Sequence, residues 1–171
     1  MKKIENVATA SGGGPRHMKF HPNKKWVYVL NELSMTVSCF HYDSENMSFK
    51  KFQDIQSLPD ELKDNRLNSA AEIRIHPNGE YLYTSNRGHD SITVFAIDTQ
   101  DGRLEFVERE SIRGSWPRNF DIDPSGKYLI AAGKYSNTLS LFDIEDDGRL
   151  SFTRKMVDLP RPICVAIQKK Q

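Results

Sequence analysis

The sequence predicts an all-β fold made of β-propeller blades, each with four antiparallel strands. Three observations predict it. The chain repeats itself about every fifty residues, the same two turns recur in its repeats, and short apolar runs rich in aromatic and β-branched residues separate the turns. We expect the whole chain, residues 1–171, to form a partial propeller of about three blades.

The repeat consists of three segments that align without gaps. These segments are residues 15–43, 70–98 and 117–145. Their turn prolines lie 55 and then 47 residues apart. Four antiparallel strands repeated at this interval are typical of propeller blades, whereas a β-sandwich does not require such self-similarity.

Two turns divide the repeats into strands. The first turn contains Pro-Asn-Gly at 77–79 and Pro-Ser-Gly at 124–126. Proline presets φ in such a turn, and glycine is free to take a positive φ. The second turn reads Asp-Gly-Arg-Leu at 101–104 and again at 147–150, which is a strong hairpin signal.

The turns also set the boundaries of the predicted blades. Complete blades are expected at about 15–53, 70–113 and 117–158. We further predict a lone outer strand of a preceding blade at 4–10 and a lone inner strand of a closing blade at 160–168. The one helix-like stretch, 59–64, lies in the connection between the first two blades.

Charge and hydrophobicity exclude two classes of partner. The chain has 24 Lys and Arg against 23 Asp and Glu, a net charge of +1, so no overall field attracts nucleic acid or an anionic membrane. No apolar run exceeds about five residues, far short of the ~20 that span a bilayer, and the N-terminus has no apolar signal-peptide core. We therefore expect neither a nucleic-acid nor a membrane partner.

Several catalytic and cofactor motifs are absent from the sequence. Cys39 and Cys164 make no disulfide framework, which favours a reducing, cytoplasmic location. No His/Cys spacing resembles a zinc site, and the sequence contains neither a G-x-S-x-G elbow nor a phosphate-binding loop. We predict no metal and no cofactor.

Polar residues that differ between equivalent positions of the repeats are the candidates for function. At the entry to the innermost strands, His17 is replaced by Glu72 and then by Asn119, so these side chains approach one channel mouth. One position earlier, Arg16 and Arg118 stand at the same mouth. Such a group can supply an acid or base and an anion clamp, or alternatively an ion-pair network that joins blades.

The loops between the second and third strands add Asn86 and Arg87 to the same face, and both are candidates for substrate binding. His21 and His76 have a different interpretation. Both directly precede a turn proline, so we predict that they are turn residues that hydrogen-bond to the backbone.

Three motifs carry a resemblance to a known family. They are GPRHMKFHPN (14–23), SAAEIRIHPNGEYLYTSNRGHDSITVF (69–95) and WPRNFDIDPSGKYLIAAG (116–133). They resemble the seven-bladed propeller lactonases, which include cycloisomerase-type 6-phosphogluconolactonases and carboxymuconate-cyclising relatives. The resemblance covers nearly all of residues 4–168 and corresponds to the C-terminal half of such an enzyme. It implies metal-independent hydrolysis of 6-phosphogluconolactone to 6-phosphogluconate, a step of the pentose phosphate pathway.

The resemblance also implies roles for individual residues. His17, Glu72 and Arg118 match positions of the family's active site. By this resemblance His17 or Glu72 activates water, and Arg118 stabilises the developing oxyanion. Arg87 or Arg16 holds the phosphate in a bidentate grip.

The length departs from the family, because seven blades of ~40–50 residues need roughly twice this chain. Two hypotheses follow. The first is a lactonase that binds a phosphorylated sugar lactone in a channel completed by self-association or by a separate N-terminal half. The second is a truncated, catalytically inactive propeller fragment that acts only as an interaction module.

Overall fold

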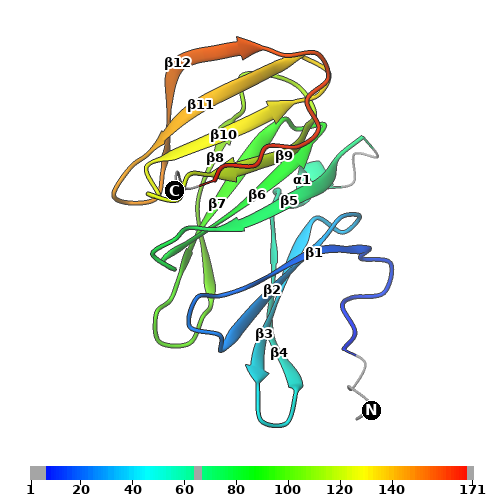
Figure 1. The fold of residues 1–171 in the computed structure, drawn as a ribbon. Coiled ribbons are helices and arrows are strands. Elements are labelled where there is room, and N and C mark those ends of the chain that lie inside the picture. Colours follow the sequence, from blue (N-terminus) through cyan, green and yellow to red (C-terminus); the bar gives the residue numbers. More distant parts are fainter. Residues whose placement is uncertain (1–6, 64–66, 169–171) are drawn as a thin grey trace.

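The computed structural model describes residues 7–63 and 67–168 and arranges them in three four-stranded antiparallel sheets (Figure 1). Each sheet takes four consecutive strands in simple order, so each is one propeller blade. The all-β prediction and the prediction of about three blades are therefore confirmed.

Blade 1 contains β1 (Pro15–Phe20), β2 (Trp26–Asn31), β3 (Thr36–Asp43) and β4 (Ser48–Gln56). Blade 2 contains β5 (Ser69–Ile75), β6 (Tyr81–Arg87), β7 (Ser91–Ile97) and β8 (Leu104–Ser111). Blade 3 contains β9 (Pro117–Ile122), β10 (Tyr128–Gly133), β11 (Thr138–Ile144) and β12 (Leu150–Asp158). The short helix α1 (Asp60–Lys63) lies in the connection where the helix-like stretch was predicted. Among the described residues, no helix is long and apolar enough to cross a membrane.

The first turn of each blade follows from its sequence. The turn closes when the amide of the residue before proline bonds to the first carbonyl of the next strand, as from His76 to Tyr81 at 2.8 Å. Gly79 (φ 81°) and Gly126 (φ 78°) supply the left-handed conformation that the turn requires. In blade 1 the equivalent residue is Lys24, which takes a φ of 60° without the freedom of glycine.

The joint between neighbouring blades is built twice from equivalent residues. The ring of Trp26 lies against Gly102 of blade 2, and the ring of Tyr81 lies against Gly148 of blade 3. A Cβ on either glycine would overlap the facing ring, so both positions require glycine for close approach as well as for their φ near 80°. In blade 1 this position holds Met47, with a φ of 52°.

Hydrogen bonds repeat across the same two joints. Tyr28 donates its hydroxyl to the carbonyl of Gly102 at 2.8 Å, and Tyr83 donates to that of Gly148 at 2.9 Å. Burial raises the pKa of both tyrosines, so each hydroxyl keeps the proton that it donates. Each pair of neighbouring sheets shares one apolar core, and these aromatic rings belong to the two cores or pack against them.

The two predicted turn histidines also contribute to the joints. Nε2 of His21 lies 2.8 Å from the carbonyl oxygen of Gly79, and Nε2 of His76 lies 2.8 Å from that of Gly126. Nδ1 of His21 accepts the amide of Asn23 at 3.1 Å within its own turn. The prediction that these histidines bond to the backbone is confirmed, and each bonds to the next blade as well.

The structure differs from the prediction at the two lone strands. Residues 4–6 of the first lie outside the described residues, and residues 7–10 form no strand. Residues 160–168 form no strand either. Two of their amides bond to side chains of β9, from Val165 to Asn119 at 2.6 Å and from Ile167 to Asp121 at 3.0 Å. A strand requires backbone pairing, which alternating apolar residues alone do not provide.

Candidate functional site

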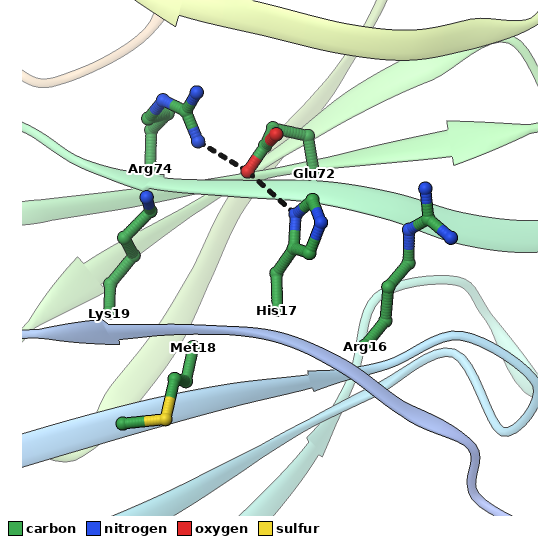
Figure 2. Close-up of a pocket in the computed structure, with 6 residues that line it drawn as sticks. All are labelled: Arg16, His17, Met18, Lys19, Glu72 and Arg74. Atoms are coloured by element: carbon green, nitrogen blue, oxygen red, sulfur yellow. Dashed lines mark hydrogen bonds and ion pairs between the residues drawn. The ribbon is translucent and has the colours of Figure 1, made fainter.

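The innermost strands β1, β5 and β9 lie next to one another and bring the candidate residues of successive blades together. A pocket of about 320 Å³ opens between β1 and β5. Its lining residues are Arg16, His17, Met18, Lys19, Glu72 and Arg74. Figure 2 shows the side chain of His17 directed from β1 toward Glu72 on β5. The structure therefore places two of the three predicted catalytic residues in direct contact.

Glu72 is the centre of the hydrogen-bond network. The residue is only 3% exposed, and both of its carboxylate oxygens accept hydrogen bonds. Oε1 receives Nδ1 of His17 at 3.0 Å, a guanidinium nitrogen of Arg74 and the amide of Ile73 at 3.0 Å. Oε2 receives the side-chain amide of Asn119 at 2.6 Å. Because burying a carboxyl group is costly unless donors surround it, these four donors account for the burial of Glu72 and occupy both of its oxygens.

His17 is the accessible member of the pair. Its side chain is 40% exposed, against 4% for that of Glu72. A carboxylate can only accept hydrogen bonds, so Nδ1 of His17 carries the proton in their contact. In the neutral ring Nε2 then holds the free lone pair. The pair therefore presents an oriented imidazole that can accept a proton from water.

Arg74 joins blade 2 to blade 3. Besides its bond to Glu72, it donates Nε to Oδ1 of Asp121 at 2.9 Å. The sequence analysis missed both residues, although a usable signal was present. Side chains two apart on a strand share one face, so Arg74 lies on the face of Glu72, and Asp121 on the face of Asn119.

Arg16 and Arg87, the predicted phosphate-binding residues, converge on Glu32. Arg16 donates Nη1 to Glu32 Oε2 at 3.2 Å and Nε to the carbonyl of Ala71 at 2.9 Å. Arg87 donates Nη2 to Glu32 Oε1 and to the carbonyl of Ala70 at 3.1 Å. Burial opposes ionisation of Glu32, but the hydrogen bonds and charges of both arginines hold its pKa below the usual range. This cluster links blades 1 and 2. It is an inter-blade ion-pair network of the kind that the sequence offered as the alternative to an anion clamp.

The structure places Asn86, predicted as a substrate-binding residue, at the end of β6 inside blade 2. Its side chain is fully buried, and its amide donates to Ser91 at 3.1 Å and to Thr93 at 2.9 Å. Its oxygen accepts the hydroxyl of Ser57. The equivalent Asn31 of blade 1 is also buried, and it bonds to two hydroxyls of its own blade. A recurring buried asparagine of this kind braces the loop between the second and third strands.

Arg118, the third predicted catalytic residue, does not line the pocket. It lies on β9, one residue before Asn119, and its side chain is half-buried. Its guanidinium makes no hydrogen bond or ion pair with any described residue. The candidate site therefore consists of the His17–Glu72 pair and the Arg74 bridge, while Arg118 lies outside the pocket on β9 with no partner for its guanidinium among the described residues. Within the described part of the chain, no cluster of three or more His, Cys, Asp or Glu residues could hold a metal ion.

The sequence of this chain is similar to those of known proteins. Residues 1–167 match the family described as "Lactonase, 7-bladed beta-propeller". The chain is 41% identical over 157 residues to the 6-phosphogluconolactonase of Bacillus subtilis (strain 168), an alignment that covers 91% of this chain and 44% of that protein. The 6-phosphogluconolactonase of Enterobacter sp. (strain 638) is 40% identical over 139 residues, which cover 81% of this chain and 41% of that protein.

Solved structures give the same result. The periplasmic gluconolactonase of Pseudomonas aeruginosa superposes with a TM-score of 0.83 at 30% identity, over 91% of this chain and 43% of that one. A protein from Bacteroides uniformis superposes with a TM-score of 0.86 at 35% identity, over 95% and 46% of the two chains. The chain thus spans less than half the length of the relatives that it matches.

Proposed function

Because the chain belongs to the seven-bladed β-propeller lactonase family, we propose that its site hydrolyses 6-phosphogluconolactone to 6-phosphogluconate without a metal ion. The observation that carries this proposal is the contact between His17 and Glu72 across two blades. It supplies an oriented base at an open pocket, which is what the addition of water to a lactone carbonyl needs.

In the proposed reaction, His17 Nε2 takes a proton from water, and the hydroxide attacks the lactone carbonyl carbon. Glu72 stabilises the imidazolium that forms, since it accepts the Nδ1 proton at 3.0 Å. When the tetrahedral intermediate collapses, the bond between the carbonyl carbon and the ring oxygen breaks. His17 returns its proton to that oxygen, which leaves the open-chain hydroxy acid.

The surroundings of Glu72 support the assignment of His17 as the base. Four donors already occupy the two oxygens of Glu72, so a water molecule would have to displace one of them. His17 Nε2 has no such competitor among the described residues. Glu72 is then an orienting residue, comparable to the carboxylate that orients histidine in a hydrolytic triad.

For the oxyanion we propose Arg118. Its guanidinium is free of hydrogen bonds and ion pairs to described residues, so a negative charge on the substrate meets no internal competitor there. It enters from β9, the strand next to β5, and directly precedes Asn119, which bonds to Glu72.

The test is the consumption of 6-phosphogluconolactone, measured above its spontaneous hydrolysis. We expect the chain to accelerate hydrolysis and His17→Ala to lose about 10²–10⁴-fold of the enzymatic rate, the usual contribution of a general base. His41→Ala is the matched control, because His41 is an exposed histidine of the same blade, on β3. A folded chain that gives no rate above the spontaneous one refutes the proposal and favours the inactive interaction module.

A further inference from the structure

One cation in the pocket has no internal partner. Lys19 extends from β1 toward β5, beside Arg74, while Met18 between Lys19 and His17 points the other way (Figure 2). The ammonium of Lys19 makes no hydrogen bond or ion pair with any described residue, although its backbone pairs with Tyr28 in the sheet. It differs in this respect from Arg16 and Arg74, the two guanidinium groups that line the same pocket.

The carboxylates around the site are already committed to other donors. Glu32 receives Arg16 and Arg87, and Glu72 receives four donors. Asp121 receives Arg74 and the amide of Ile122 at Oδ1, and the amide of Ile167 at Oδ2. Three carboxylates thus meet Arg16, Arg74 and Arg87, and among the cations that line the pocket this leaves the ammonium of Lys19 without a carboxylate from the described residues. A compact ammonium with three donors is suited to bind a phosphate.

The position of Lys19 relative to the base fits a phosphorylated lactone. Residues two apart on a strand share one face and lie about 6.6 Å apart along it. His17 and Lys19 therefore project from one face of β1, as Figure 2 shows. This separation is comparable to the span of a six-membered lactone ring and its exocyclic carbon, which separates the carbonyl from the phosphate.

We propose that Lys19 binds the phosphate monoester of the substrate and so selects phosphorylated over unphosphorylated lactones. The inference rests on the proposed function. It assigns the phosphate not to Arg16 and Arg87, whose charges Glu32 offsets, but to Lys19, whose charge no carboxylate of the described residues offsets. His17 then acts on the carbonyl at one end of the ligand while Lys19 holds the other end.

The experiment titrates the full chain with 6-phosphogluconate, gluconate and inorganic phosphate by isothermal calorimetry. We expect Lys19→Met to weaken binding of 6-phosphogluconate about ten- to a hundredfold, the effect of losing a charge-assisted hydrogen bond. Gluconate binding is expected to stay unchanged, and Lys19→Arg is expected to restore most of the affinity. Lys25→Met, which removes an exposed lysine from the first turn of the same blade, is the control. Inorganic phosphate tests whether the anion alone suffices or the sugar-acid part is needed.

Two results would overturn the inference: Lys19→Met binds 6-phosphogluconate as well as the wild type does, or it loses gluconate and 6-phosphogluconate equally. Melting curves of the variants establish that the loss is not one of folding. The readout separates this inference from the proposed function. Lys19-dependent binding without hydrolysis leaves the phosphate site standing, whereas hydrolysis with Lys19-independent binding removes the site and leaves the function.

Discussion

Gly102 offers a quantitative test of how blades join. Its φ is 79°, and a Cβ at this position would overlap the indole ring of Trp26 from blade 1. Alanine in the left-handed region costs about 1–2 kcal/mol, and forcing an extra carbon into a packed contact costs about 1–3 kcal/mol more. We expect Gly102→Ala to lower the free energy of unfolding by about 3 kcal/mol, which corresponds to a fall in Tm of roughly 6–12 °C for a chain of this size.

Gly12 separates the two contributions. It has nearly the same φ, 77°, but no atom lies within 4 Å of a Cβ built there. Gly12→Ala should therefore cost only the backbone part, about 1–2 kcal/mol. Thermal unfolding followed by circular dichroism measures both variants. Equal losses for Gly12→Ala and Gly102→Ala would refute the reasoning, because they would show that the Trp26 contact contributes nothing.

A double-mutant cycle identifies the contact itself. In a Trp26→Ala background the ring is gone, so Gly102→Ala should fall to the cost seen at Gly12. If it stays at about 3 kcal/mol, the strain arises from the turn and not from the joint between blades.

Two further outcomes concern stability. Tyr81→Ala should lower the free energy of unfolding by about 2 kcal/mol in chemical denaturation, because the ring of Tyr81 packs on Gly148. Tyr128 occupies the equivalent position of blade 3 but is 43% exposed, so Tyr128→Ala should change it by no more than about 0.5 kcal/mol. Equal effects would contradict the repeated joint. Arg87 and Arg16 depress the pKa of Glu32 in the folded chain. The stability that the Glu32 carboxylate gives the fold is therefore present above about pH 4.5 and is lost as the pH falls through the lowered pKa. Between pH 6 and pH 2, the free energy of unfolding should therefore fall less steeply for Glu32→Gln than for the wild type. The same pH dependence in both proteins would contradict this.

The blades could be predicted because their signals are local. The turn prolines and glycines recur at the interval of the repeat, and each acts within a few residues of itself. The same comparison found His17 and Glu72, since both stand at the equivalent position of adjacent inner strands. Residues 160–168 form no strand here, because a strand depends on a pairing partner, which is not a local property of the sequence.

The charges of the site could not be assigned from the sequence. Arg16, Arg87 and Glu32 come from different strands and loops, and only the inter-blade spacing shows that one carboxylate serves both arginines. The burial of Asn86 could not be predicted either, because a position near the end of a strand does not by itself say whether the side chain is buried. The position of Lys19 could have been predicted, because side chains alternate along a strand and residue 19 therefore lies on the same face of β1 as His17.

The turns of blade 1 restrict how this chain can associate. In blades 2 and 3 the second hairpin carries a glycine, Gly102 or Gly148, against which an aromatic ring of the preceding blade packs. Blade 1 has Met47 at this position, and its Cβ would occupy the space that such a ring needs. If the joint were repeated between two copies, Tyr128 of one would meet Met47 of the other instead of a glycine. The joint is therefore directional and selective. We therefore expect copies of this chain not to close head to tail through this joint, and we expect a blade that covers Tyr128 in the same way to carry glycine at its own hairpin.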